Sequence, residues 1–343
     1  MPGVEKLKYC CNGKWLDSST DKWMDVYDPS RGEVIAQAPC CTRQELQAVL
    51  EAAQAAYKAW SQTPVIRRTQ ILFKFRDLVI GHMEELTKLV ARENGKVWEE
   101  AEGDILKVKE PVELACGAAT LMQGESLANT STGYDSVLYR EPVGVFGGIV
   151  PFNFPAMIPF GWMTPLCIAT GNCMVLKSSS TTPMTSIRLL ELLQEAGLPP
   201  GVVSVITTDR TVGDLMLTSP IIKGICFVGT TSVGLQVYSK AAGGGKRVQA
   251  QCEAKNHALV MDDAVLERTV RGIINSSFGC AGERCMALPA VVAQEGIHDK
   301  LVERLVANAR AIKVGCAYDK SSQLGPVVNR KHMDRIYGWI DKG

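Results

Sequence analysis

A cysteine follows a glycine-containing turn and an arginine in the run 278–286, FGCAGERCM. The nucleophile of cysteine chemistry is the thiolate, and a nearby guanidinium or helix N-terminus lowers the thiol pKa that controls its population. Arg284 precedes Cys285 directly, and we expect a helix to start beside it. Cys285 is therefore the first candidate for a covalent catalyst. The alternative is an ordinary buried thiol, because the chain has 12 cysteines and no histidine base lies nearby in the sequence.

Asn153 lies between two phenylalanines and two prolines in the run 151–155, PFNFP. Attack of a thiolate on an aldehyde creates an oxyanion, which needs hydrogen-bond donors where the charge develops. The Asn153 amide fits that role, and the backbone N–H of Cys285 would be the second donor. The alternative is a turn residue, since asparagine is common in turns.

Two further segments have the residue types of a nucleotide site. The run from Gly229 to Gly234, GTTSVG, follows a predicted strand and opens a predicted helix, so free backbone N–H groups would face a pyrophosphate. Its spacing is not the Gly-x-Gly-x-x-Gly fingerprint, and an ordinary helix-start turn is the alternative. Lys177 follows another predicted strand, where a cation can hold ribose hydroxyls; a solvated loop lysine is the alternative.

The elements that must position these residues alternate between strand and helix. After short strands in residues 1–40, a capping box at Thr42 and Glu45 starts a series of amphipathic helices. Apolar runs typical of strands buried on both faces then alternate with helices, which predicts a doubly wound parallel sheet with ligands at the carboxyl ends of its strands. The predicted strands are 143–150, 173–177, 202–206 and 224–228.

Bulk composition excludes several classes of protein. Lys and Arg number 37 against 36 Asp and Glu, without the basic stripe of a nucleic-acid-binding protein. The apolar runs are too short to cross a bilayer. The cysteines form neither a disulfide framework nor a Cys-x-x-Cys metal pair, so we expect a reducing compartment and no metal site. A length of 343 residues predicts two domains or three.

Taken in order, PFNFP, Lys177, the turn after Gly229, the run 254–257 (AKNH) and Cys285 resemble the aldehyde dehydrogenase superfamily. Within it, residues 140–159 and the run GERCMAL at 282–288 look most like the CoA-acylating methylmalonate-semialdehyde dehydrogenases. The resemblance runs from about residue 12 to residue 326. Several motifs in a fixed order make it specific, where any one of them alone would be weak.

The resemblance implies an aldehyde dehydrogenase-like α/β fold. Residues 1–134 and 141–259 would form the NAD-binding domain, and 135–140 part of an oligomerisation strand region. Residues 260–343 would be a truncated catalytic domain that lacks the family's C-terminal third. A homo-oligomer is expected from the full-length family. Eukaryotic relatives are mitochondrial, whereas the N-terminal residues show no presequence, which allows a cytoplasmic location.

The resemblance also implies which residues would bind NAD. Ser180 stands where relatives carry a glutamate that grips the adenosine ribose, and a hydroxyl is not an ionised acceptor, so weaker NAD binding is expected. The implied cofactor residues are Val150, Phe152, Lys177, Ser180, Gly229, Thr230, Gly234 and Cys252.

The position before Cys252 bears on how the acyl group leaves. Hydrolytic aldehyde dehydrogenases have a glutamate there to activate water, whereas this chain has Gln251, an amide that takes no proton at neutral pH. This substitution resembles the branch in which CoA accepts the acyl group. Glu253 replaces a glycine of the relatives, and its carboxylate is expected near the nicotinamide, where it would obstruct binding or act as another base.

For a substrate carboxylate, the branch uses two arginines. Arg284 matches one of them, and Lys107 stands at the position of the other. A lysine there keeps the positive charge but cannot bind a carboxylate with two parallel N–H donors, as an arginine does. The implied activity is NAD-dependent oxidation of methylmalonate or malonate semialdehyde with acyl transfer to CoA. The alternatives are a hydrolytic aldehyde dehydrogenase, which Gln251 disfavours, and a catalytically silent truncated paralogue that binds a nucleotide or a partner protein.

Overall fold

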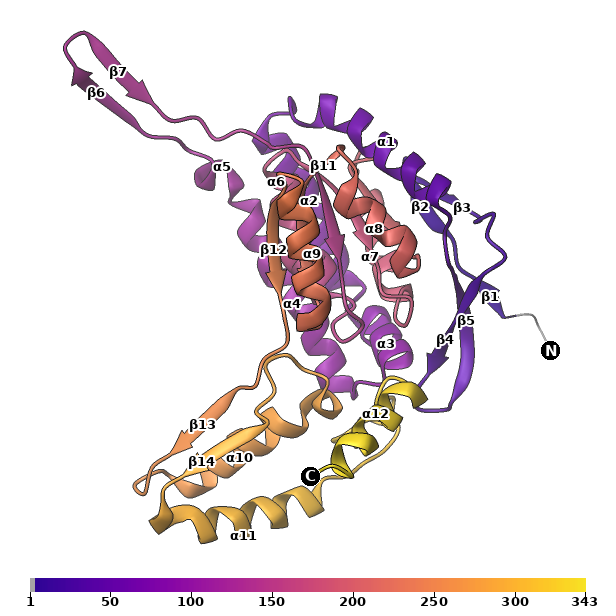
Figure 1. The fold of residues 1–343 in the computed structure, drawn as a ribbon, viewed down its shortest axis with the longest axis vertical. Coiled ribbons are helices and arrows are strands. Elements are labelled where there is room, and N and C mark those ends of the chain that lie inside the picture. The colour runs from indigo at the N-terminus through magenta and orange to yellow at the C-terminus, as the bar shows by residue number, and fades with distance from the viewer. Residues whose placement is uncertain (1–3) are drawn as a thin grey trace.

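The computed structural model describes residues 4–343, and its main body is a parallel sheet with helices on both faces (Figure 1). A smaller lobe, built from the residues after about 256, extends from one end of the body. A long hairpin projects from the other end. No helix among residues 4–343 is long and apolar enough to cross a membrane, and none of their His, Cys, Asp and Glu side chains group in a way that could hold a metal ion.

The central sheet has five strands, all parallel, in the order β10-β9-β8-β11-β12. β8, the first of these five strands along the chain, lies in the middle, and later strands add on either side, which confirms the doubly wound sheet. The strand order therefore reverses at β8, and ligands of such sheets bind at this switch point. The strands are β8 (Val145–Ile149), β9 (Cys173–Lys177), β10 (Val203–Ile206), β11 (Ile222–Val228) and β12 (Arg247–Gln251).

Helices bury both faces of this sheet. α1 begins at the predicted capping box, in which Thr42 Oγ1 accepts from the Glu45 N–H and the Glu45 carboxylate accepts from the Thr42 N–H. With α8 and α9 it covers one face; α2, α4, α6, α7 and the π-helix η1 lie on the other, and α3 packs on α4 and α7. The bounds are α1 (Arg43–Trp60), α2 (Val65–Gly81), α3 (Met83–Asn94), α4 (Trp98–Cys116), α5 (Ala118–Leu121), η1 (Met157–Met163), α6 (Thr164–Ala169), α7 (Met184–Glu195), α8 (Arg210–Thr218) and α9 (Thr231–Gly243).

The projecting hairpin consists of β6 (Ser126–Ser131) and β7 (Tyr134–Val137), and all their residues are exposed. The family resemblance implied a strand region at 135–140, of which only residues 135–137 lie in a strand. β6 is mostly polar and lacks an alternating apolar pattern, so periodicity gave no signal for it. The turn between the strands contains Gly133, whose φ of 81° is in the left-handed region.

Short strands precede α1, as predicted. β1 (Glu5–Lys6), β5 (Glu33–Pro39) and β4 (Trp23–Asp28) form one sheet, and β2 (Tyr9–Cys11) pairs with β3 (Lys14–Leu16).

The smaller lobe contains two parallel strands, β13 (His257–Val260) and β14 (Ala290–Ala293), with α10 (Leu266–Phe278) and α11 (Glu295–Ala311). Between α10 and β14 lies the short 3-10 turn η2 (Gly279–Gly282), and α12 (Arg330–Ile340) returns toward the body. The core of this lobe has five buried residues: Val260, Val270, Ile273, Ile297 and Leu301.

Candidate active site

The loop that carries Asn153 leaves β8 at the point where the strand order reverses. Its backbone is held by side chains of the main body. The Phe152 carbonyl accepts hydrogen bonds from Asn94 Nδ2 and Thr182 Oγ1, both at 3.0 Å. The Lys96 ammonium lies over the Phe154 ring, 3.5 Å from its centroid. The loop is thus fixed on both sides of Asn153.

A buried ion pair between Lys96 and Asp104 also supports the Asn153 loop. Lys96 Nζ lies 3.0 Å from Asp104 Oδ2, and both side chains are almost completely buried. Asp104 Oδ1 also accepts from the Met157 N–H at 2.8 Å, where η1 begins. Burial raises the pKa of Asp104, against the lowering effect of Lys96. The pair connects α4 to the part of the loop that follows Asn153.

Cys285 lies in a tight turn in which the Ala287 N–H donates to the Arg284 carbonyl at 3.1 Å. No helix begins at Cys285, so that expectation was wrong. α10 ends at Phe278, and Cys280 and Ala281 then adopt left-handed φ angles of 51° and 52°, which prevents helix continuation. The support for the thiolate that was expected from a helix start is therefore absent. Burial raises the pKa of the neighbouring Cys280 thiol to about 12.

The Asn153 and Cys285 loops meet. Asn153 Nδ2 donates to the Glu283 carbonyl at 2.8 Å, two residues before Cys285. An asparagine amide carries two N–H groups, so one is left for a ligand oxygen. Among residues 4–343, neither the buried Asn153 Oδ1 nor the Cys285 backbone N–H has a hydrogen-bond partner. The two predicted oxyanion donors thus lie in adjoining loops with unused hydrogen-bonding capacity.

Asn256 fixes the turn at Cys285 and was missed in the sequence. Its Nδ2 donates to the carbonyls of Cys285, at 3.0 Å, and Ala287, at 2.7 Å. It lies directly before β13, in the run 254–257 (AKNH) that was counted among the family motifs without a role for Asn256.

Glu283 is a second residue that sequence reasoning missed. Its side chain is 4% exposed and accepts from the Val328 N–H at 3.1 Å, with His332 Nε2 at 3.3 Å. Burial raises the Glu283 pKa to about 7 and lowers that of His332. The His332 ring also packs edge-on against Phe152, with centroids 5.5 Å apart. These contacts tie α12 to both loops of the site.

The two residues predicted to bind a substrate carboxylate lie in different surroundings. Arg284 lines a polar cavity of about 770 Å3 with Glu100, Arg271 and Lys320. Lys107 is exposed on α4 and forms an ion pair with Glu110 at 2.7 Å, and it is not among the residues that line this cavity. The structure therefore does not bring the two cations together.

The predicted pyrophosphate turn does open a helix. Thr230 is the N-cap of α9, and its side chain makes no capping hydrogen bond. The Gly229 N–H donates to the Gln251 carbonyl at 3.1 Å. Gly234 lies so close to Cys252 Sγ that a Cβ would clash with it. These glycines therefore let the end of β12 approach the start of α9.

Lys177 ends β9, where its carbonyl accepts from the Val150 N–H at 3.3 Å. Its side chain lines a cavity of about 220 Å3 between α8 and α9, with Arg210 and Val233. Burial lowers the Lys177 pKa. No hydrogen bond or ion pair joins this ammonium to any of residues 4–343. Ser180, three residues later, is half-buried and does not line this cavity.

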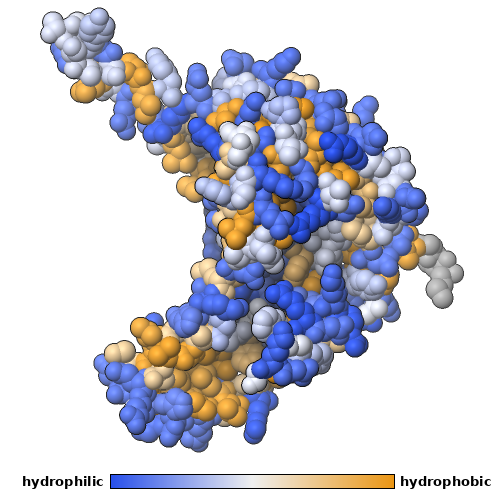
Figure 2. All heavy atoms as spheres, viewed as in Figure 1, coloured by the Kyte–Doolittle hydropathy of each residue, from blue (hydrophilic) through white to orange (hydrophobic). Residues whose placement is uncertain are grey.

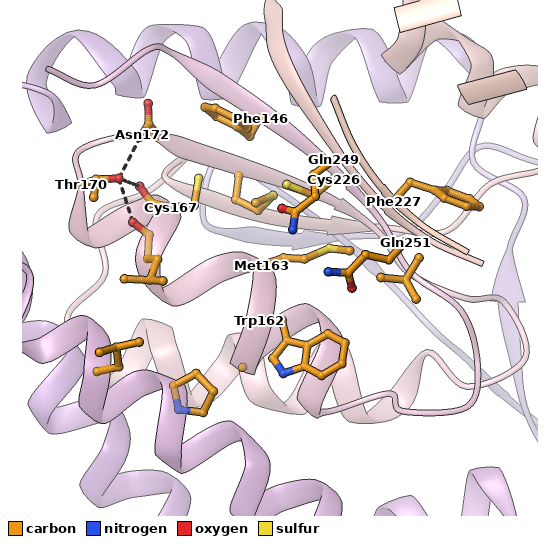
Figure 3. Close-up of a pocket in the computed structure, with 16 residues that line it drawn as sticks. Phe146, Trp162, Met163, Cys167, Thr170, Asn172, Cys226, Phe227, Gln249 and Gln251 are labelled. Atoms are coloured by element: carbon orange, nitrogen blue, oxygen red, sulfur yellow. Dashed lines mark hydrogen bonds between the residues drawn. The ribbon is translucent and has the colours of Figure 1, made fainter. Parts of the chain in front are cut away.

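Gln251 and Glu253 leave β12 in different directions. Figure 3 shows the amides of Gln249 and Gln251 extending into a largely apolar cavity of about 640 Å3, near Trp162. Cys285 is not among the lining residues. The Glu253 carboxylate instead accepts from the Thr231 N–H at 2.8 Å, so it lies at the start of α9.

Comparison with known proteins agrees with this arrangement. Residues 15–343 match the model of the aldehyde dehydrogenase family. The chain belongs to the aldehyde dehydrogenase family. It is 50% identical to malonate-semialdehyde dehydrogenase 1 of Geobacillus thermodenitrificans over 99% of this chain and 70% of that protein. It is 46% identical to malonate-semialdehyde dehydrogenase of Listeria monocytogenes over its whole length and 70% of that protein.

Two solved aldehyde dehydrogenases have nearly the same fold. The methylmalonate-semialdehyde dehydrogenase of Oceanimonas doudoroffii superposes with a TM-score of 0.96 at 37% identity, over 98% of this chain and 69% of that one. A Sinorhizobium meliloti protein assigned to the same enzymes and solved with NAD gives 0.97 at 36% identity, over 99% and 70%. The resemblance inferred from the motifs is thus confirmed at the level of the family and the fold.

Proposed function

We propose that this aldehyde dehydrogenase oxidises malonate or methylmalonate semialdehyde with NAD and transfers the acyl group to CoA. One observation carries the proposal: the Asn153 loop and the Cys285 loop are joined, through Asn153 Nδ2 and the Glu283 carbonyl, at the switch point of the sheet. The choice of substrate is supported by the names of the relatives. Those relatives are all named as dehydrogenases, and none supports a silent binding protein.

In the proposed first step, the Cys285 thiolate attacks the aldehyde carbon, a C–S bond forms, and the carbonyl oxygen takes the negative charge. The free N–H of Asn153 and the backbone N–H of Cys285 would donate to that oxygen. The tetrahedral adduct then expels a hydride and becomes a thioester on Cys285. NAD, when bound, supplies the hydride acceptor.

The residues at the carboxyl edge fit an anionic dinucleotide. The ammonium of the half-buried Lys177 has no partner among residues 4–343 and faces the cavity between α8 and α9. The first turn of α9 offers backbone N–H groups to a phosphate, and the one of Thr231 donates to the Glu253 carboxylate. Lys177 would hold the adenosine ribose, and the turn from Gly229 to Gly234 would hold the pyrophosphate. Ser180 offers only a hydroxyl and does not line this cavity.

The thioester would be released by a thiol. Gln251 carries an amide that cannot remove a proton from water, so hydrolysis lacks a base at this position. The CoA sulfur attacks the thioester carbon, acyl-CoA forms, and the Cys285 thiolate leaves. Loss of CO2 from the β-carboxylate, with uptake of a proton, gives acetyl-CoA from malonate semialdehyde and propionyl-CoA from methylmalonate semialdehyde.

The test is NADH formation from both semialdehydes, followed by absorbance with and without CoA. Without CoA we expect one burst of about one NADH per chain, and with CoA steady turnover. By resemblance to the hydrolytic branch, Gln251→Glu should add CoA-independent turnover, since a general base contributes roughly 10²- to 10⁴-fold. This requires the new carboxylate to turn toward Cys285, which does not line the cavity that Gln251 faces. Gln249→Glu is the matched control, because Gln249 lies on the same strand and lines the same cavity. Steady turnover of the unmodified chain without CoA would contradict acyl transfer to CoA.

A further inference from the structure

We propose that the Glu253 carboxylate competes with the pyrophosphate of the dinucleotide for the start of α9. The carboxylate occupies this position until NAD displaces it. The proposal deepens the proposed function and rests on its NAD site. The Glu253 carboxylate accepts from the N–H of Thr231, the first residue of α9, at 2.8 Å. This N–H is one of the groups that a helix N-terminus offers to a phosphate. The sequence suggested obstruction near the nicotinamide, whereas the structure places the carboxylate at the pyrophosphate turn.

The position of Glu253 follows from the backbone around it. Gln251 accepts from the Gly229 N–H at 3.1 Å, and Cys252 Sγ packs against Gly234. Both contacts join the end of β12 to the turn before α9 or to its first residues. These contacts place the next residue in the chain, Glu253, within hydrogen-bond distance of the Thr231 N–H. A residue without a side chain at this position would leave that N–H free.

A second, independent observation points to a ligand beside this carboxylate. The cavity of about 220 Å3 between α8 and α9 contains the ammonium of the half-buried Lys177, which has no acceptor among residues 4–343. Val233, in the first turn of α9, also lines this cavity. A ligand whose hydroxyl oxygens accept from the Lys177 ammonium and whose phosphates continue toward the helix start would meet Glu253. A dinucleotide has this chemistry.

The competition is electrostatic and local. A carboxylate and a pyrophosphate are both anions attracted to the partial positive charge at the start of a helix. They also repel each other, so phosphate binding requires that the carboxylate turn away. Thr231 and Glu253 are both exposed, which leaves the side chain free to rotate into solvent. Glu253 therefore weakens NAD binding without closing the site.

Calorimetry with NAD and with adenosine tests the proposal, using Glu253→Gln and Glu253→Gly. Both variants should lower the Kd for NAD by about three- to tenfold, the range expected from an anion at a helix N-terminus. Affinity for adenosine, which has no phosphate, should stay the same. The gain should shrink at high salt, because the site is exposed. Glu195→Gln is the control, since Glu195 is an exposed glutamate at the end of α7.

Three outcomes would overturn the inference, and they differ in what else they affect. Unchanged or weaker NAD binding by Glu253→Gln, with NADH formation intact in the unmodified chain, would contradict the role of Glu253 as a competitor. The proposed function would not be affected. An equal gain for adenosine would show a general opening of the cavity rather than competition for phosphate. If neither the unmodified chain nor a variant binds NAD at millimolar concentration, the result would also contradict the NAD site on which the proposed function depends.

Discussion

The loops of Asn153 and Cys285 meet in the candidate site, but they leave regions that are built differently. The Asn153 loop follows a strand in the middle of a five-stranded sheet, with buried helices on both faces. The Cys285 loop leaves a lobe whose sheet has two strands and whose core has five buried residues. Apolar side chains cover part of this lobe's surface (Figure 2), and Leu259 and Val292 on its two strands are exposed.

The difference shows what keeps the nucleophile loop in place. Cys280 donates its N–H to Glu100 of α4 at 2.6 Å, and the Glu283 carbonyl accepts from Asn153. A small core stabilises its lobe little, since hydrophobic stabilisation scales with buried apolar area. The order of the Cys285 loop therefore depends on hydrogen bonds from the larger region in addition to those of Asn256, whereas the Asn153 loop is held mainly by its own region.

The largest expected effect is the loss of the nucleophile in the smaller lobe. It should abolish the chemistry there and leave cofactor binding in the main body almost unchanged. Cys285→Ser should lower NADH formation by at least ~10⁴-fold, as for the loss of a catalytic nucleophile. NAD affinity should stay within about twofold, because the residues that face the nucleotide cavity belong to the main body. Cys316→Ser, another partly exposed cysteine, is the control. Substantial NADH formation by Cys285→Ser would remove Cys285 from the reaction.

The next effect tests how the main body holds the Asn153 loop. Lys96→Met leaves the buried Asp104 carboxylate without its cation, which should reduce the free energy of unfolding by about 3–5 kcal/mol. Arg330→Ala breaks the exposed Arg330–Asp334 pair of α12 and should cost at most about 0.5 kcal/mol. Urea unfolding measures both. A loss below about 1 kcal/mol in Lys96→Met would show that the pair does not support the loop.

Each region contains a buried glutamate with a raised pKa, so substituting one glutamate isolates the pH dependence that its region contributes. Burial raises the pKa of Glu93 in α3 and of Glu283 to about 7. The folded state therefore favours the protonated carboxyl: the stabilisation is complete below the unfolded pKa near 4.5 and is lost as the pH rises through 7. Glu283→Gln should remove the pH-dependent part of the free energy of unfolding that Glu283 contributes. This part is on the order of 2–3 kcal/mol between pH 4.5 and 7.5.

Unfolding midpoints at pH 5 and pH 8 measure this part of the free energy of unfolding. His332 has a lowered pKa and contributes the opposite slope, lost as the pH falls below its unfolded pKa near 6.5. Comparing Glu283→Gln with the unmodified chain isolates the carboxyl. Identical pH dependence in the two proteins would contradict a buried, raised Glu283, while Glu93 should keep its own dependence in both.

The smallest effect concerns the turn at Cys285 itself. Asn256→Ala removes two hydrogen bonds to the carbonyls of this turn, worth about 1–2 kcal/mol together. We expect kcat to fall by about tenfold with little change in NAD affinity. Asn308→Ala, whose amide donates within α11, is the matched control from the same lobe. A loss of NAD affinity equal to the loss in kcat would show that Asn256 acts on the whole site.

The features predicted from the sequence were those set by local signals. The capping box at Thr42, the buried strand that became β9 and the turn at Gly229 each depend on neighbouring residues, and the structure contains them. The doubly wound sheet followed from the alternation of such segments.

The features that the sequence did not predict depend on distant packing. Arg284 precedes Cys285, yet its side chain lines a cavity with Glu100 of α4. The helix expected beside Cys285 is absent because of two left-handed residues that are not glycines. Asn256 and Glu283 contact the turn at Cys285 or residues far away in the chain. Side-chain direction at these positions is set by tertiary contacts, which residue types and spacing do not encode.

The strand order of the central sheet also has a consequence for folding kinetics. β8 pairs with β9, which follows it closely, but on its other side Val145 pairs with Ile222 of β11. Non-local pairing of this kind requires a long loop to close first and slows folding. Until β11 is synthesised and docked, one side of β8 presents unpaired backbone groups in an apolar strand. Chaperone dependence and aggregation of refolding intermediates are therefore expected at that stage.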